Sequence, residues 1–551
     1  MAMLVSRRGF CRASCAALAA FATGSTLAAC SSGTSDEDAL GERKTSGEVI
    51  VAMSTDSEPD AGFDPFYGWA CGEHASEPLV QSTLVKTDAE LAIENDLATG
   101  YECSADALTW TFDLRDDVLF TDGTQLTAAD AAFTLNGIKA FEGAELDLSF
   151  MEQAEATSDT RLVITLNKPY NVLLYTLASI GIVPQASYDA ASYGANPIGS
   201  GRYVLEQWDK GQQAIFAANP NYYGEEPAMQ RVVVVFMEED AALAAAQAGE
   251  VDVAYTSATL ADEVPSGYEL LSCETVDCRG ISLPTQEPGA SKDDAGSSYA
   301  SGNAATAHVE LRRAMNYALD RDTMVANVLG GHGSAAYSVC DGLAWASDDM
   351  VIEHDADYAA SLLTEAGWQL GDDGIYVLDG QRAAFDLYYP ASDSVRQALA
   401  AEFADQMAAF GIEVTMKGSS WSTDADGIYA HEYSDPVLWG WGANSPQQLY
   451  TLLYGSSSGN YADYASEAVD AYLDAALATG TLEESYGLWQ QAQWDGTAGI
   501  APQGASTWVW LVNVDHLYFV REGLGVAEQK PHPHGQGWAI LNDVDTWSWQ
   551  A

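Results

Sequence analysis

Short apolar runs alternate with amphipathic stretches along most of the chain. Residues 110–114 and 162–166 alternate apolar with polar side chains, which is typical of half-buried strands. Residues 231–237 (RVVVVFM) form a continuous apolar run, which predicts a strand buried on both faces. Further strands are expected at residues 49–53, 251–255, 385–389 and 412–416.

Helical patterns fill the intervals between these strands. Residues 127–138 begin with Thr127 and Asp130 in the spacing of a capping box. Residues 240–248 and 395–410 each end next to a glycine, which commonly terminates helices. Further helices are expected at residues 309–329 and 356–366. This alternation predicts a mixed α/β architecture. Residues 287–307 contain few large apolar side chains and predict a loop or linker.

The first thirty residues resemble an export signal. Arginines precede an uncharged run at residues 13–29, which is shorter than the roughly 20 strongly apolar residues of a spanning helix. Residues 6–10 (SRRGF) resemble a twin-arginine signal, and residues 27–30 (LAAC) resemble a bacterial lipobox. The sequence therefore predicts cleavage before Cys30 and a lipid anchor on Cys30. The alternative is an ordinary secretory signal. We expect no membrane span in the mature chain.

The composition is that of a globular protein with an acidic surface. The chain has 551 residues, of which 47% are hydrophobic and 19% are charged, and this length predicts about two to four domains. Asp and Glu number 80 against 23 Lys and Arg, a net charge of −57. This charge would repel nucleic acid and anionic lipid. Residues 30–46 are rich in Ser, Thr, Gly and acidic residues and predict a flexible tether.

Five cysteines follow Cys30: Cys71, Cys103, Cys273, Cys278 and Cys340. At most two disulfides can form among them, and the pairing stays open. Cys273 and Cys278 are close enough in sequence to form a local bridge. No C-x-x-C motif is present, so a zinc ribbon or a redox motif is not predicted.

Catalytic motifs are weak. The sequence has no H-E-x-x-H, no P-loop and no G-x-G-x-x-G. Residues 455–459 (GSSSG) match G-x-S-x-G, but they belong to a Ser/Gly-rich loop and not to a strand-to-helix elbow. The sequence therefore predicts no enzyme and no cofactor.

Five blocks, in order along the chain, carry a family resemblance. They are FDP (63–65) with EPLV (77–80), WTFDLR (110–115) with FTDG (120–123) and TAAD (127–130), NPIGSGRY (196–203) with NPNYY (219–223), LRRAM (311–315) with ALDR (318–321), and LLTEAGW (362–368) with FGIEV (410–414). Together they resemble the family 5 extracytoplasmic solute-binding proteins of peptide- and nickel-type ABC importers. The lipoprotein signal is independent support.

The resemblance implies a two-lobe, periplasmic-binding-protein-like α/β fold (type II) with an extra subdomain and a hinge. Lobe I would comprise residues 47–80, 196–283 and 515–551, subdomain Ib residues 81–195, and lobe II residues 284–514. Ligand contacting both lobes would stabilise the closed form by hinge bending. The partners implied are an ABC permease and its ATPase subunits. We expect a monomer outside the cytoplasm, anchored to the cell membrane by lipid only.

The aromatic-rich stretch 421–446 is the best candidate for ligand binding, through Trp421, Trp439 and Trp441. In peptide-binding relatives, an Asp three residues after a Gly-Trp pair holds the α-ammonium of the peptide. Asn444 stands at that position here, and a neutral amide loses the charge-assisted bond to an ammonium. The alternative is that Trp439 and Trp441 are core residues.

The opening segment offers Tyr67, Trp69 and His74, which by the resemblance reach the cleft. The alternative is a capped turn that does not contact ligand. Histidine also suits nickel. His532 and His534 form the only close pair, and His431 is a further candidate ligand, although each can equally be structural.

The sequence thus predicts a receptor that captures an oligopeptide or peptide-like ligand. Asn444 and the His532–His534 pair keep nickel or a nickel chelate open as the cargo instead. From another class, a secreted hydrolase or adhesin is supported only by the export signal and the aromatic content.

Overall fold

The computed structural model describes residues 36–551, apart from residues 72–76, 142, 145, 293–297, 392, 421–422, 424–426, 429–432, 535–536 and 551. The chain divides into two units, residues 1–43 and 44–551. The export signal and Cys30 lie outside the described residues. Helix α1 (Asp36–Ser46) occupies part of the segment expected to be a tether, and the tether role stays a prediction. Within the described part, no helix has the length and hydropathy that crossing a bilayer requires.

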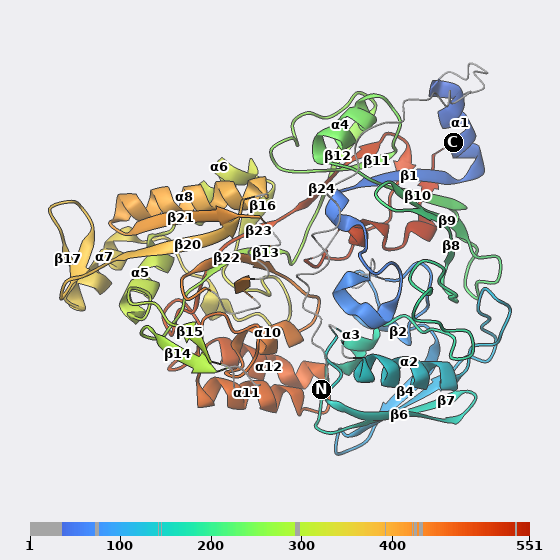
Figure 1. Ribbon diagram of the computed structural model, residues 1–551, viewed down its shortest axis with the longest axis horizontal. Helices are drawn as coiled ribbons and strands as arrows, with labels where there is room; N and C mark the ends of the chain where they lie inside the picture. The colour runs from blue at the N-terminus through green and yellow to red at the C-terminus, as the bar shows by residue number, and fades with distance from the viewer. Residues whose placement is uncertain are drawn as a thin grey trace, which may run out of the picture. The chain divides into compact units, whose positions relative to one another are not determined.

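A seven-stranded sheet forms lobe I, in the order β12-β24-β11-β1-β10-β9-β8 (Figure 1). Its strands are β1 (Glu48–Met53), β8 (Tyr203–Asp209), β9 (Gln213–Ala218), β10 (Arg231–Phe236), β11 (Val253–Thr256), β12 (Tyr268–Cys273) and β24 (His516–Arg521). Strand β1 is parallel to both β10 and β11. Val232, Val233 and Val234 of β10 are all buried, which confirms the prediction that both faces of this strand are covered. Helix α4 (Glu239–Gln247) covers one face, and the turn η5 (Trp538–Leu541) covers the other.

A six-stranded sheet forms lobe II, in the order β16-β23-β13-β22-β20-β21. Its strands are β13 (Cys278–Ser282), β16 (Gly333–Ala335), β20 (Ala384–Pro390), β21 (Glu413–Ser419), β22 (Val437–Trp441) and β23 (Trp508–Val514). One face packs against α5 (Val309–Ala318), α6 (Arg321–Leu329) and α8 (Ser394–Phe410). The other face carries Trp439, Trp508 and Trp510, which join a second apolar cluster with α10 (Gln447–Leu453), α11 (Glu467–Leu477) and α12 (Leu482–Gln493).

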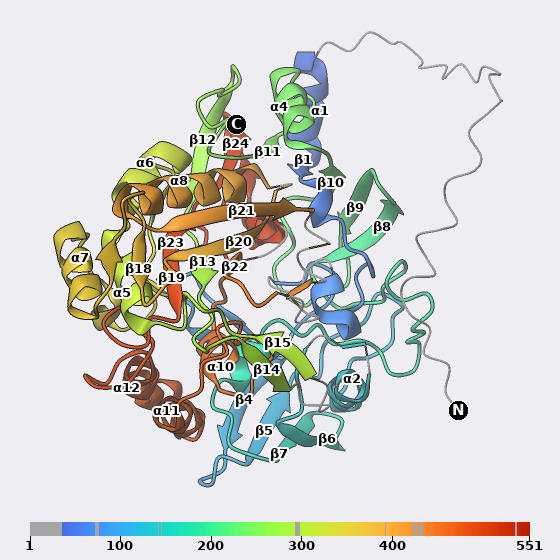
Figure 2. The same ribbon diagram turned by 60° about the vertical axis from the view of Figure 1, so that its left-hand side comes forward.

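A four-stranded antiparallel sheet, β4-β5-β7-β6, forms subdomain Ib, and α2 lies against it (Figure 2). These elements are β4 (Ala98–Cys103), β5 (Thr109–Leu114), α2 (Ala128–Ala140), β6 (Met151–Ser158) and β7 (Arg161–Leu166). The predicted capping box is confirmed, because the backbone N–H of Thr127 donates to Asp130 Oδ2 at 2.8 Å.

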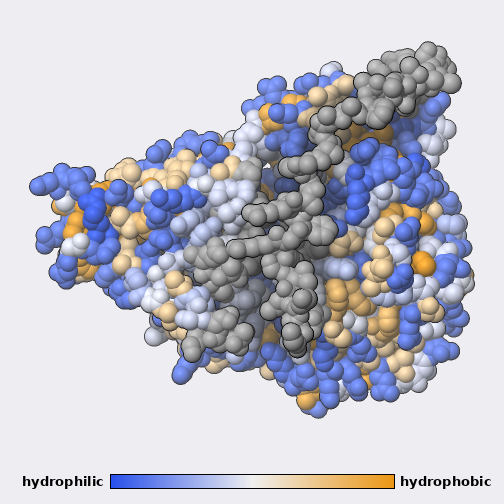
Figure 3. Space-filling model, viewed as in Figure 1, coloured by the Kyte–Doolittle hydropathy of each residue, from blue (hydrophilic) through white to orange (hydrophobic). Residues whose placement is uncertain are grey.

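Short elements complete the chain. They are η2 (Thr55–Ser57), η3 (Pro65–Ala70), β2 (Val85–Thr87), β3 (Ile93–Asn95), α3 (Leu173–Leu177), β14 (Gly289–Lys292), β15 (Ser298–Ser301), η4 (Asp348–Met350), α7 (Ala356–Glu365), β17 (Gln369–Leu370), β18 (Tyr376–Leu378), β19 (Gln381–Arg382), β25 (Leu524–Gly525), η6 (Val544–Thr546) and β26 (Ser548–Trp549). On the face shown in Figure 3, hydrophilic residues predominate and hydrophobic ones are scattered between them.

Three local expectations differ from the structure. The helix expected over residues 309–329 is two helices, because Asp320 ends the first and caps α6 by accepting from the Thr323 N–H at 2.9 Å. The loop expected over residues 287–307 contains the antiparallel pair β14–β15. Cys273 and Cys278 form no bridge, because they lie on strands of different sheets, and none of the five cysteines after Cys30 is in a disulfide.

The chain passes between the two lobes twice, from β12 to β13 and from β23 to β24. The boundary between lobes I and II that the sequence predicts, at residues 283/284, would leave β13 in lobe I. In the structure β13 pairs with β22 and β23 of the lobe II sheet, which favours a passage between the lobes at residues 274–277. The second crossing lies next to residue 515, where the predicted boundary stands.

Candidate functional site

The two lobes meet at the ends of their parallel strands. In α/β sheets, ligands bind at the carboxyl ends of parallel strands, where loops converge. Asp56 and Glu238 follow β1 and β10 in lobe I, whereas Asp393 follows β20 in lobe II. Burial raises the pKa of Asp56, and the carboxylates of Glu238 and Asp393 raise it further. The N–H of His534, in the C-terminal segment of lobe I, donates to the Gly442 carbonyl just after β22 at 2.9 Å, so the carboxyl edge of the lobe II sheet faces lobe I.

Two buried arginines lie beside the carboxyl end of β22. Arg279 and Arg396 are 8% and 4% exposed. A Cβ added at Gly440 would lie 2.9 Å from Arg279 Nη1 and 2.6 Å from Arg396 Nη2, so only glycine fits there without a shift of these guanidinium groups. Arg396 pairs with Asp393. Although burial opposes ionisation of Asp393, Arg396 and Arg279 lower its pKa. Lobe II therefore presents two guanidinium groups in a setting of buried carboxylates.

Asp277, at the first crossing, is the centre of a buried polar network that we call the hinge network: Asp277, Arg279, His516, His532 and His534. Asp277 Oδ1 bonds to Arg279 Nη1 and, at 2.6 Å, to His534 Nδ1. Its Oδ2 lies 3.1 Å from both Arg279 Nη2 and His516 Nε2. Burial opposes ionisation, but Arg279 and His534 outweigh it and hold the pKa of Asp277 well below its usual range.

The predicted histidine pair lies in this network. His532 Nδ1 is 3.2 Å from His516 Nδ1, and His532 Nε2 is 3.0 Å from Gln529 Oε1. Burial, followed by the charges of His516 and Lys530, lowers the pKa of His532 well below its usual value. Burial also lowers the pKa of His534, against the opposing effect of Asp277. Both histidines thus bridge hinge residues within the protein.

Backbone hydrogen bonds fix the segment 531–534 beside the first crossing. The N–H of Val276 donates to the His532 carbonyl at 2.9 Å, and the N–H of His532 donates to the Glu274 carbonyl at 3.0 Å. The N–H of His534 donates to the Gly442 carbonyl, also at 2.9 Å. This segment therefore lies against the end of β22.

Two of the predicted aromatic residues, Trp439 and Trp441, both contact the apolar cluster under the lobe II sheet but differ in burial. Trp439 is 4% exposed and belongs to the apolar cluster under the lobe II sheet. Trp441 is half-buried, and its ring centroid lies 5.7 Å from that of Tyr461. Asn444, three residues on, donates from Nδ2 to the Pro531 carbonyl at 2.9 Å. Trp441 and Asn444 are thus on one segment at the carboxyl edge.

The opening segment forms η3, whose first turn is capped by Asp64. Asp64 Oδ1 accepts from the Phe66 N–H at 3.1 Å, and Asp64 Oδ2 accepts from the Tyr188 hydroxyl at 3.0 Å. The ring of Tyr67 packs edge-on against Phe141 at 4.9 Å. Its role in ligand binding stays a prediction. The predicted residues His74, Trp421 and His431 and the side chain of Trp69 lie outside the described part of the structure.

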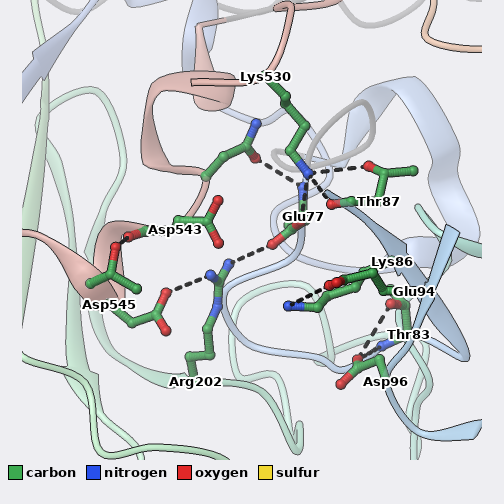
Figure 4. Close-up of polar contacts among 12 residues, drawn as sticks. Glu77, Thr83, Lys86, Thr87, Glu94, Asp96, Arg202, Lys530, Asp543 and Asp545 are labelled. Carbon is green, nitrogen blue, oxygen red and sulfur yellow. Dashed lines mark hydrogen bonds and ion pairs between the residues drawn. The ribbon is translucent and has the colours of Figure 1, made fainter. Parts of the chain in front are cut away.

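A second buried network joins subdomain Ib to lobe I (Figure 4), and we call it the junction network: Glu77, Thr87, Arg202, Lys530 and Asp545. Lys530 Nζ is 2.5 Å from Glu77 Oε1 and 2.9 Å from the Thr87 carbonyl. Arg202 lies between Asp545, at 2.6 Å, and Glu77, at 3.6 Å. Burial opposes ionisation of Glu77, but Arg202 and Lys530 outweigh it and lower its pKa.

Sequence reasoning missed the central members of both networks. Arg279 has a signal, because it is a charged residue within the otherwise uncharged run 278–283. No local sequence pattern marks Asp277 or His516, because the two residues contact each other only in the folded protein and are 239 positions apart in the sequence. Among the described residues, no group of three or more His, Cys, Asp or Glu side chains is placed to hold a metal ion.

Comparison with known proteins assigns this arrangement to a family. Residues 92–463 match the model of the bacterial extracellular solute-binding proteins, family 5 Middle. Protein XP55 from Streptomyces lividans is 31% identical over 530 residues, which covers 92% of this chain and 91% of that protein. The oligopeptide-binding protein AppA from Bacillus subtilis is 25% identical over 456 residues, 78% of this chain and 80% of AppA.

A solved structure shows the same fold. The crystal structure of NikZ from Campylobacter jejuni in complex with Ni(L-His) superposes with a TM-score of 0.74 at 23% sequence identity. The alignment covers 91% of this chain and 99% of NikZ. The two-lobe α/β fold predicted from the sequence is therefore confirmed.

Proposed function

This chain belongs to the family 5 bacterial extracellular solute-binding proteins, and on that premise we propose that it captures an oligopeptide or peptide-like ligand between its two lobes. Family members are receptors of ABC importers that deliver cargo and perform no chemistry on it, so the chain is not an enzyme. The loop at residues 455–459 agrees with this, because the Ser457 hydroxyl donates to the Thr451 carbonyl at 2.6 Å as a local turn contact.

One observation carries the peptide-like assignment. Trp441 Nε1 and Asn444 Oδ1 are both buried, and neither has a hydrogen-bond partner among the described residues. Other buried polar atoms also lack a partner among the described residues, but these two lie on one segment at the carboxyl edge, where one external group could pair with both. A peptide amide offers both an acceptor and a donor, together with apolar surface for the face of Trp441.

The same segment argues against recognition of a free α-ammonium. Asn444 is neutral, and its amide N–H already donates to the Pro531 carbonyl. The Gly442 carbonyl is likewise taken by the N–H of His534. Asp277 and Asp393, the nearest carboxylates, are already paired with Arg279 and Arg396. We therefore propose that the ligand presents a neutral group here, as an amino-blocked peptide does.

Calorimetric titration and tryptophan fluorescence with matched free and N-acetylated peptides test this function. We expect binding of the N-acetylated series, and a loss of at least about tenfold in affinity for Trp441→Ala, as stacking on a bound group is worth about 0.5–1.5 kcal/mol beyond area burial. Trp549→Ala, remote in the C-terminal β26, is the matched control. Asn444→Asp should shift preference toward free-amino peptides. No binding by any peptide would contradict the proposal.

Nickel or a nickel chelate is the second candidate, and the orientation of His534 favours it. A carboxylate that accepts from one ring nitrogen of a histidine is the usual support of a metal ligand, and Asp277 has this relation to His534 Nδ1. Because the described residues include no group of three ligands, a small chelator would have to supply the rest. Metal analysis tests this candidate on protein purified without a His tag, with nickel and free histidine added. If the protein retains no nickel, the candidate is rejected.

We also propose that Cys30 carries the lipid anchor and that the monomeric receptor docks on an ABC permease served by ATPase subunits. Cys30→Ala should release the protein from the membrane fraction into the soluble extracytoplasmic fraction. Retention of Cys30→Ala at the membrane would contradict the anchor. Turnover of any peptide or glycan in a hydrolysis panel would revive the alternative of a secreted hydrolase.

A further inference from the structure

Subdomain Ib is joined to lobe I by both covalent and polar contacts. Its chain leaves and re-enters lobe I at neighbouring positions, where the N–H groups of Gly201 and Tyr203 donate to the carbonyls of Val80 and Leu79 at 2.8 and 2.9 Å. The junction network adds the bond from Lys530 to Thr87. When the lobes rotate about the crossings, subdomain Ib should therefore move with lobe I.

Asn171 of subdomain Ib nevertheless binds lobe II. Its side-chain Nδ2 donates to the Ala476 carbonyl at 2.8 Å, to Thr479 Oγ1 at 2.7 Å and to the Thr481 carbonyl at 3.3 Å. Its backbone N–H donates to the Leu477 carbonyl at 3.1 Å. Asn171 is 6% exposed. The last carbonyls of a helix have no partner inside the helix, and Asn171 thus satisfies the carboxyl end of α11 from another part of the fold.

Flanking contacts cross the same boundary. Lys168 Nζ lies 5.4 Å from the ring centroid of Tyr450 in α10. The rings of Tyr175 and Trp345 meet edge-on with centroids 6.2 Å apart. Both crossings, at residues 274–277 and at residue 515, join a strand of the lobe I sheet to a strand of the lobe II sheet, so subdomain Ib and lobe II are not consecutive along the chain. These contacts must therefore break if lobe II swings away.

We propose that Asn171 and the loop that follows α11, residues 477–481, form a latch that holds subdomain Ib against lobe II, and that the arrangement joined in this way is the closed form. The inference goes beyond the proposed ligand, because it concerns how the closed form is populated. A latch that favours the closed form raises apparent ligand affinity in proportion to the closed fraction. Asn171 is on this view a positioning residue and contacts no ligand.

Small-angle X-ray scattering and hydrogen–deuterium exchange on the ligand-free mature chain test the latch from both sides of the contact. Asn171→Ala removes the donor, and Thr479→Val removes the hydroxyl on lobe II. We expect both variants to have a larger radius of gyration and about tenfold faster exchange at residues 477–481, as loss of such bonds is worth about 1–2 kcal/mol.

The matched control is Asn167→Ala, which removes hydrogen bonds to the Ser149 and Met151 carbonyls within subdomain Ib only. It should leave both readouts unchanged. If either latch variant folds and matches wild type in both readouts, or if Asn167→Ala changes them equally, the inference is overturned. Neither readout needs ligand, so the failure of the proposed cargo leaves this test unaffected.

Discussion

The junction network and the hinge network contain similar buried charges but differ in their partners. In the junction network, Glu77 meets one arginine and one lysine, Arg202 and Lys530. In the hinge network, Asp277 meets one arginine and two histidines. The first network joins parts that stay together, and the second lies where the lobes cross. Arginine and lysine thus surround the carboxylate at the junction of subdomain Ib with lobe I, whereas one arginine and two histidines surround the carboxylate at the crossing.

Asp277→Asn should produce the largest effect. The substitution leaves the Arg279 guanidinium buried without its carboxylate, and breaking one side of a buried ion pair typically costs about 3–5 kcal/mol. We expect a drop of this size in the free energy of unfolding measured by urea titration. Asp515→Asn, whose carboxylate meets the Ser272 hydroxyl at the surface, is the control and should change stability by less than about 0.5 kcal/mol. If Asp277→Asn and Asp515→Asn lowered the free energy of unfolding equally, the expected importance of Asp277 for stability would be contradicted.

Glu77→Gln should cost less, about 2–3 kcal/mol, because Arg202 keeps its bond to Asp545. The lowered pKa keeps Glu77 ionised in the folded protein, so its contribution is lost only at pH values below the usual range of a glutamate. The stability difference from wild type should therefore be the same at pH 7.5 and pH 5.5. Glu94→Gln, which breaks the exposed pair with Lys86 at 3.7 Å, is the control. If the stability difference between Glu77→Gln and wild type instead changed between pH 7.5 and pH 5.5, the contrast between the junction network and the hinge network would be contradicted.

Gly440→Ala should cost about 1–3 kcal/mol, because the new methyl group would overlap the guanidinium groups of Arg279 and Arg396. Gly487→Ala, in helix α12 with no atom near its added Cβ, is the matched control. It should stabilise the protein slightly, since glycine is unfavourable inside a helix. Thermal unfolding measures the stability of both variants. If Gly487→Ala were destabilised as much as Gly440→Ala, overlap with the two arginines would not explain the effect at Gly440.

His532→Gln should have the smallest effect, and it should depend on pH. Burial lowers the pKa of His532 in the folded protein, whereas the unfolded chain takes up a proton near pH 6.5. Stability is therefore greatest above this value and falls as the pH drops, by up to about 1.4 kcal/mol between pH 7.5 and 5.5. His532→Gln should flatten this slope, which is measured by urea titration at several pH values. If the slope of stability against pH stayed the same in His532→Gln, the lowered pKa of His532 would not be its cause.

Local pattern was enough to predict most elements of the fold. The strand β10 and the helix α8 lie where their runs predicted, because a period of two or 3.6 residues depends only on neighbours along the chain. The break between α5 and α6 was missed, since the cap at Asp320 lies inside a pattern that is otherwise continuous. Of the predicted site residues, Trp441 and Asn444 lie at the carboxyl edge, whereas Trp439 is a core residue, and a role of any of them in ligand binding stays a prediction.

The sequence by itself determined the family and the order of helices and strands, because motifs and periodicity are properties of consecutive residues. Only the tertiary structure decided that Asp277 meets His516 and His534, and that Asn171 caps α11. These partners lie hundreds of positions apart, and the energy of each contact comes from burial and hydrogen-bond geometry that exist only after the lobes have packed.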